Sequence, residues 1–196
     1  MSDLLNKNLF FVKEHVGLFK AANNFDIYDP QTQQMILECR EDSLGIISKI
    51  FRFTRYKRMT PFDIAVRAPG GSTLVRVARG VSFYLSTVDV FDGAPGKTLG
   101  FFKQKSFTIG GSFDVYNAAG TLAFSLMGKW TGWEFKFLAG DRELAKVSKK
   151  WAGIGKELFT TADNYMLEIS SSVPANDPVR PLILAAVLCI DMVLKE

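Results

Sequence analysis

A run of cations with no acid among them is the clearest chemical feature of this sequence. It spans residues 49–58 and interleaves its cations with three aromatic rings: Lys49, Phe51, Arg52, Phe53, Arg55, Tyr56, Lys57 and Arg58. Each cation close to an anionic membrane surface contributes about 1 kcal/mol to binding, and aromatic rings sit well at the boundary of lipid and water. The segment therefore predicts a contact with anionic lipid headgroups. The alternative is a solvated loop whose rings belong to the core.

Groups suited to enzyme catalysis are sparse. The only histidine, His15, lies in a predicted strand with no serine or cysteine nucleophile motif near it. Cys and His do not occur at metal-ligand spacing. Four aspartates alternate with apolar residues, which places them on the outer, solvated face of a sheet: Asp26, Asp63, Asp89 and Asp114. The sequence predicts a protein that is not an enzyme.

Composition and charge are those of an ordinary globular domain. The chain has 196 residues, 47% of them hydrophobic, and we expect residues 1–196 to form a single domain. The net charge of +4 allows an anionic partner but does not imply nucleic acid. Cys39 and Cys189 are expected to be small buried hydrophobes without a disulfide. The N-terminus lacks the apolar core of a signal peptide, so we expect an intracellular, cytoplasmic protein.

Short alternating runs fill most of the chain from Leu9 onward. Phe62-Asp63-Ile64 is typical: every second residue is apolar, a turn follows at Pro69-Gly70-Gly71, and a second alternating run begins at Thr73. The pattern recurs as hairpins along the chain and gives about twelve antiparallel strands. An open sheet of that size would expose two long edges, so we expect it to close into a barrel.

The last apolar stretch supplies what such a barrel lacks. Residues from Pro181 to Leu194 are apolar on every side of a helix, and the helix can start at Pro178 or at Pro181. At about 1.5 Å per residue it reaches roughly 21 Å, short of the roughly 30 Å of a bilayer core. A barrel of about twelve strands has a lumen that side chains alone do not fill. We therefore predict an all-β fold with one central helix, a closed antiparallel barrel around the hydrophobic C-terminal helix.

Two motifs near the end of the chain resemble a known family. Residues 146–153 read Lys-Val-Ser-Lys-Lys-Trp-Ala-Gly and residues 159–165 read Phe-Thr-Thr-Ala-Asp-Asn-Tyr. They are similar to the phospholipid scramblase pattern Lys-x-Ser-Lys-x-Trp-x-Gly, then Phe-Thr-Asp-Ala-Asp-Asn-Phe. Residues 58–62, 128–130 and 189–191 extend the resemblance over most of the chain. It implies the Tubby C-terminal-like fold, a twelve-stranded barrel around a central helix, in agreement with the periodicity.

The resemblance also implies a function and a metal. Scramblases move phospholipids between leaflets without ATP and respond to calcium, whereas Tubby-like relatives bind lipid headgroups or protein partners. Carried over to this chain, the calcium ligands would be Asp163, Asn164 and Glu168. The chain departs from the family's calcium loop at Thr161 and Met166, where the family has Asp and Gly, and both changes weaken a Ca²⁺ site. The alternative there is a strand entry with a turn-forming Asp-Asn pair.

Two functions follow as expectations. The first is a scramblase-related, lipid-associated protein peripheral to the plasma membrane, with phospholipids as partners. The second is a soluble barrel that binds a lipid headgroup, a small apolar ligand or a protein. The family's proline-rich extension and palmitoylated cysteines have no counterpart in this sequence, so no acyl anchor of that type is expected.

Overall fold

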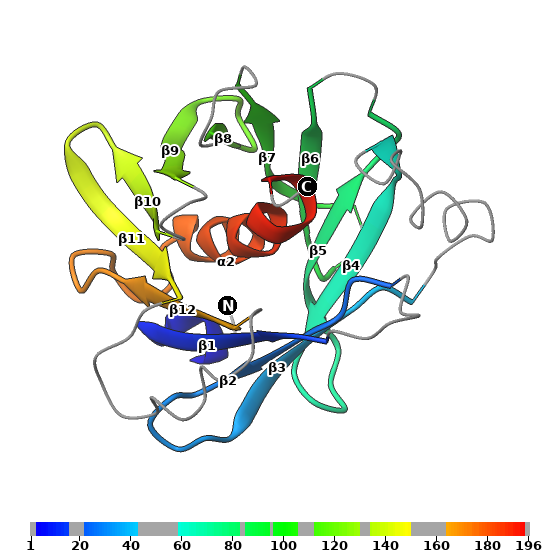
Figure 1. The fold of residues 1–196 in the computed structure, drawn as a ribbon, viewed down its shortest axis with the longest axis vertical. Helices are drawn as coiled ribbons and strands as arrows, with labels where there is room; N and C mark the ends of the chain where they lie inside the picture. The colour runs from blue at the N-terminus through cyan, green and yellow to red at the C-terminus, as the bar shows by residue number, and fades with distance from the viewer. Residues whose placement is uncertain are drawn as a thin grey trace.

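A computed structural model of the chain describes residues 3–15, 22–42, 59–82, 85–94, 96–105, 112–129, 134–149 and 164–194. Twelve antiparallel strands form a closed barrel in which β1 pairs with both β2 and β12 (Figure 1). The predicted fold class is confirmed. The strands are β1 (Leu9–Glu14), β2 (Phe25–Tyr28), β3 (Met35–Arg40), β4 (Phe62–Arg67), β5 (Thr73–Arg79), β6 (Thr87–Asp92), β7 (Thr98–Gln104), β8 (Ser112–Asn117), β9 (Leu122–Lys129), β10 (Glu134–Ala139), β11 (Arg142–Ser148) and β12 (Asn164–Ile169).

Alternation along each strand separates the two faces of the barrel wall. In β4, Phe62, Ile64 and Val66 are buried inside, and Asp63 and Arg67, which alternate with them, lie on the outer face. A register slip of one residue would turn the apolar side chains outward, so the buried face holds the pairing in place. The same rule fixes which side chains are available to a partner outside the barrel.

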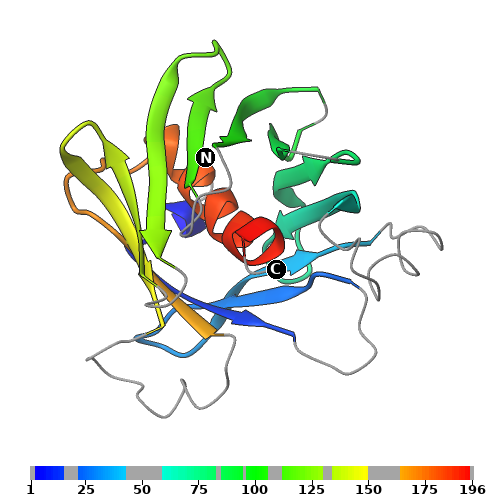
Figure 2. The same cartoon turned by 45° about the horizontal axis from the view of Figure 1, so that its top comes forward.

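The C-terminal helix α2 (Val179–Cys189) fills the lumen (Figure 2). Every residue from Arg180 to Cys189 is buried, and the helix continues as a π-helical turn, Ile190–Leu194. Its start falls between the two predicted positions. Asp177 accepts a hydrogen bond from the backbone amide of Val179 (2.9 Å), and Pro178 and Pro181 have no amide hydrogen. The first turn therefore presents few free donors, which suits burial in an apolar lumen.

Gly100 on β7 allows close approach of the helix and the neighbouring strand. A Cβ atom there would lie 2.1 Å from the backbone oxygen of Tyr116 on β8 and 3.1 Å from Cδ2 of Leu182 on α2. Atoms cannot approach that closely, so any side chain at this position must displace the strand, the helix or both.

Arg180 joins the start of α2 to the seam where the first and last strands meet. Its side chain is buried, and its guanidinium donates to the backbone oxygens of Lys7 (3.0 Å), Val173 (2.8 Å) and Pro174 (2.7 Å) and to Oδ1 of Asn8 (2.8 Å). Burial lowers the pKa of Arg180 from its ordinary value, although Asp177 opposes this. Because its acceptors come from both ends of the chain, this arginine helps to close the barrel.

The two ends of the barrel differ in their connections. We call the end where α2 begins the helix-entry end and the end where it finishes the helix-exit end. Five hairpin turns lie at the helix-entry end, and each contains a residue with positive φ: Gln33, Gly70, Gly96, Gly120 and Gly140. Strand direction places the other connections at the helix-exit end, among them those that follow β3, β5 and β11.

We expect Gly100→Ala to lower the free energy of unfolding by about 1–3 kcal/mol, because the added methyl group meets the backbone of β8 and the side chain of Leu182. Urea unfolding followed by circular dichroism measures the change. Gly80→Ala is the matched control, since a Cβ atom at Gly80 has nothing within 4 Å. Equal stability of the two variants would contradict the close approach of α2 and β7.

Candidate functional site

The predicted headgroup segment lies outside the described residues. The connection between β3 and β4 contains Lys49, Arg52, Arg55, Lys57 and Arg58, and the described residues on its two sides are Asp42 and Met59. Both of these flanking residues are at the helix-exit end. The predicted contact of these five cations with anionic headgroups stays a prediction.

The predicted calcium ligands lie at the start of β12 and along it. Asp163 is outside the described residues, whereas Asn164 is buried and Glu168 is half-buried. Asn164 and Glu168 are four strand residues apart, which corresponds to about 13 Å. Two ligands of one Ca²⁺ ion must each lie about 2.3–2.6 Å from it. The described pair does not converge on a single ion, and Glu168 instead binds Lys146 (3.0 Å). In the described part of the chain no group of three His, Cys, Asp or Glu side chains is placed to hold a metal.

Glu168 does line a groove on the outside of the barrel seam. The groove has a volume of about 420 Å³ and lies over β1, β12 and β11. Its charged side chains are already matched, because Lys146 pairs with Glu168 and Lys136 pairs with Glu143, each at 3.0 Å. Such exposed pairs contribute little to stability, but they leave no excess charge to attract an ion.

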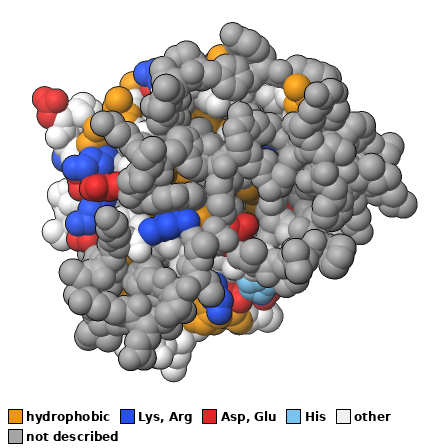
Figure 3. All heavy atoms as spheres, viewed as in Figure 1, with side chains coloured by type: hydrophobic (Ala, Val, Ile, Leu, Met, Phe, Trp, Pro, Cys, Tyr) orange, Lys and Arg blue, Asp and Glu red, His pale blue; other side chains and the backbone are white. Residues whose placement is uncertain are grey.

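A network of charges covers the outer wall next to the β3–β4 connection. His15 shares a hydrogen bond with Asp26 (2.6 Å), Arg40 donates to the other oxygen of Asp26 (2.6 Å), and the chain of contacts continues through Glu38 to Arg67. In Figure 3 the histidine side chain lies beside acidic side chains on the molecular surface. Burial tends to raise the pKa of Asp26, but the hydrogen bonds from His15 and Arg40 outweigh it and hold the pKa below its ordinary value. Arg40 and Arg67 are thus occupied by acids and are poor candidates for binding a headgroup.

The outward aspartates were predicted to be solvated, and this is wrong for Asp26 and Asp114, whose side chains are largely shielded. Asp26 belongs to the network above, and Asp63 forms a bidentate salt bridge with Arg76. Asp114 accepts hydrogen bonds from Lys105 (3.0 Å) and Ser125 (2.6 Å). Cross-strand partners were not visible in the alternation that placed these residues outside. Asp89 alone remains exposed with no ion-pair or hydrogen-bond partner in the described structure.

Both cysteines are buried and free, in β3 and in α2. Burial raises the pKa of each thiol well above its ordinary value, so neither is a reactive thiolate. An open pocket of about 590 Å³ lies at the helix-entry end, with Leu5, Leu74, Leu99 and Pro178 among its lining residues. Among the helices of the described segments, none is both long enough and apolar enough to span a membrane.

These observations define the class of protein: a closed twelve-stranded barrel filled by its own C-terminal helix, with a polar outer wall. The family model for Scramblase matches residues 8–196, so the chain belongs to the scramblase family. An X-ray structure of a protein from Arabidopsis thaliana shares the fold, with a TM-score of 0.56 and 15% sequence identity, and the match covers 95% of this chain and 93% of that chain. No curated protein matches the chain. Membership of the family supports a scramblase-like or lipid-associated role.

We expect Asp26→Asn to lower the free energy of unfolding at neutral pH by about 1–3 kcal/mol, because it removes charged hydrogen bonds to His15 and Arg40. A carboxyl with a lowered folded pKa stabilises the fold above its unfolded pKa of about 3.9, and the contribution is lost as the pH falls through the folded value. The variant should therefore lose less stability than the wild type between about pH 5 and pH 2. Denaturant unfolding at several pH values tests this. Asp141→Asn, in an exposed turn, is the control, and identical acid profiles for wild type and Asp26→Asn would contradict the role of the network.

Proposed function

We propose that this protein is a peripheral phospholipid-binding barrel whose helix-exit end faces an anionic membrane surface. One observation carries the proposal. In the described residues four large apolar side chains are exposed, and three lie toward the helix-exit end: Val81 (61%), Leu85 (39%) and Met127 (52%). Only Leu122 (53%) lies at the helix-entry end. Apolar side chains that rim a charged surface are suited to entering the headgroup layer of a bilayer.

The connections that leave this end support the same orientation. The segment that carries the five cations begins and ends there, and so does the segment that carries Asp163. If the cations meet anionic headgroups, each adds about 1 kcal/mol of attraction. Calcium binding by the segment that carries Asp163 would act at the same end, and it remains part of the proposal inherited from the family.

Burial of α2 favours binding from outside over insertion of the helix. Arg180 and residues 182–189 are each at most 2% exposed, so the helix already has an apolar environment. Transfer to a bilayer would gain little hydrophobic free energy and would empty the lumen, which costs the contacts of the barrel lining. A lipid therefore meets the outer wall and the ends of the barrel.

ATP-independent movement of phospholipids between leaflets is the second candidate, and membership of the scramblase family favours it. Scrambling by the purified protein in liposomes that contain a fluorescent lipid would appear as loss of the fluorescence that is otherwise protected in the inner leaflet. Transfer no faster than in empty liposomes, with and without Ca²⁺, would exclude scrambling and leave surface binding untouched.

We expect Val81→Asp to reduce binding to vesicles of phosphatidylcholine and phosphatidylserine at least fivefold, because it places a carboxylate where an apolar side chain enters the headgroup layer. Flotation of the protein with vesicles measures the bound fraction. Leu122→Asp makes a comparable change at the other end and should bind like the wild type. Equal losses for both variants would contradict the proposed orientation.

Replacement of the five cations with glutamine should weaken binding to the same vesicles by at least tenfold, because several units of about 1 kcal/mol are removed. The effect should shrink as salt is raised, since screening acts on the same attraction. Salt-independent binding, or a variant that binds like the wild type, would show that the segment is a solvated loop.

A further inference from the structure

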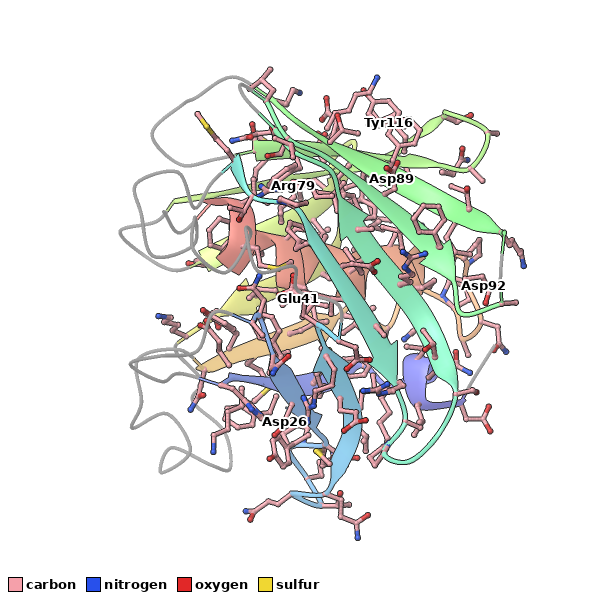
Figure 4. All side chains as sticks on the ribbon, turned by 90° about the vertical axis from the view of Figure 1, so that its right-hand side faces the viewer. Asp26, Glu41, Arg79, Asp89, Asp92 and Tyr116 are labelled. Carbon is pink, nitrogen blue, oxygen red and sulfur yellow. The ribbon has the colours of Figure 1, made fainter. Side chains whose placement is uncertain are left out.

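One cross-strand row on the outer wall contains an acid and two aromatic rings. Ala78, Asp89, Phe101 and Tyr116 are direct neighbours on β5, β6, β7 and β8. The residues that flank the row along β5, β6 and β7 are buried, and so is Val115 on β8, so the row faces outward. Asp89 and Tyr116 lie close together on this wall in Figure 4. Ala78 is small and leaves the side of Asp89 away from the rings open.

The rings of Phe101 and Tyr116 are stacked on one another. Their centroids are 5.0 Å apart and their planes differ by 13°. This spacing is close to the distance of about 4.8 Å between neighbouring strands, so the rings are stacked in the direction that runs across the strands. The face of Phe101 that does not touch Tyr116 is therefore turned toward β6, where Asp89 is its direct neighbour.

Lys103 lies beside the stacked rings and does not fill this space. Its Nζ atom is 5.4 Å from the centroid of Phe101 and 5.6 Å from that of Tyr116, so it is shared almost equally between them. The neighbouring carboxylate of Asp114 is taken by Lys105 (3.0 Å). Within the described structure Lys103 has no acidic partner, and Asp89 has no basic one. An unmatched anion and an unmatched cation thus flank one aromatic pair.

We propose that Asp89, Phe101, Tyr116 and Lys103 bind the phosphocholine headgroup of phosphatidylcholine at a membrane surface. The trimethylammonium group lies between the carboxylate of Asp89 and the open face of Phe101, where charge attraction and the ring quadrupole act on the same cation. The ammonium of Lys103 pairs with the phosphate. The headgroup is zwitterionic, and its two charges match the two unmatched charges of the site.

The position of the site agrees with the proposed orientation, on which the membrane source of the headgroup rests. Lys103 is two residues closer than Phe101 to the helix-exit end of β7. If that end faces the bilayer, Lys103 is on the side of the lipid phosphate, and Asp89 is on the side of the choline group that extends away from it. A lipid headgroup can then bind with its phosphate toward the bilayer and its choline group away from it, as in the membrane.

Titration with soluble phosphocholine, followed by amide chemical shifts of the whole protein, tests the site. Asp89→Asn and Phe101→Leu should each weaken phosphocholine and choline binding threefold to tenfold. Lys103→Gln should weaken phosphocholine and leave choline unchanged. Asp141→Asn is the control for loss of one exposed carboxylate, and thermal unfolding verifies that each variant is folded.

Three outcomes would overturn the proposal. Inorganic phosphate that binds as tightly as phosphocholine would mean that Lys103 attracts any anion. If Asp89→Asn binds phosphocholine as tightly as Asp141→Asn does, Asp89 does not contact the choline group. Vesicles in which phosphatidylethanolamine replaces phosphatidylcholine, with equal phosphatidylserine, should bind the wild type more weakly, and equal binding would exclude phosphatidylcholine as the source. The effect of Val81→Asp on vesicles is separate, so the proposed orientation and this site can fail independently.

Discussion

Mutual burial of the lumen and the C-terminal helix is the constraint on which the rest of the structure depends. A twelve-stranded barrel has an inner surface that needs an apolar filling, and α2 has no polar face to turn to water. Each element removes the apolar surface of the other from solvent, and together they form one continuous core. The fit is close, since Gly100 has no room for even a methyl group against β8 and Leu182. Function is therefore left to the outer wall and the two ends.

Two buried arginines bracket this helix. Arg180 at its start is held by carbonyl oxygens of residues near the N-terminus and of the β12–α2 connection. Arg79 lies near the end of α2, where it donates to Ser86 and to the backbone oxygen of Thr60 and lies 4.8 Å from the centroid of the Phe62 ring. A buried cation is costly unless it forms hydrogen bonds, so the hydrogen bonds of each arginine stabilise one arrangement of the residues around it.

The architecture was predictable because it depends on local patterns. Phe62-Asp63-Ile64 and its repeats predicted both the strands and their inward faces. The apolar C-terminal stretch is too short to span a bilayer and has no polar face to expose to water, which left the lumen as its environment. Pairing partners were not predictable in this way, because they depend on register. Arg76 meets Asp63 only because β4 and β5 pair as they do, with a bulge near Val66. The stacked rings of Phe101 and Tyr116 arise from the same long-range alignment, and no motif in the sequence marks them.

Charge matching on the wall then becomes informative about function. Most described cations of the outer face are paired with acids: Lys7, Arg40, Arg67, Arg76, Lys97, Lys105, Lys136 and Lys146. Each such pair contributes little to stability, but it removes a charge that would otherwise attract a partner. Against this background Asp89 and Lys103 stand out, because they remain unmatched on either side of an aromatic pair. Other charges of the described wall, such as Lys13 and Arg142, also have no ion-pair partner, but Asp89 and Lys103 offer an anion and a cation beside the same aromatic pair, and a zwitterionic ligand satisfies both without leaving a net charge.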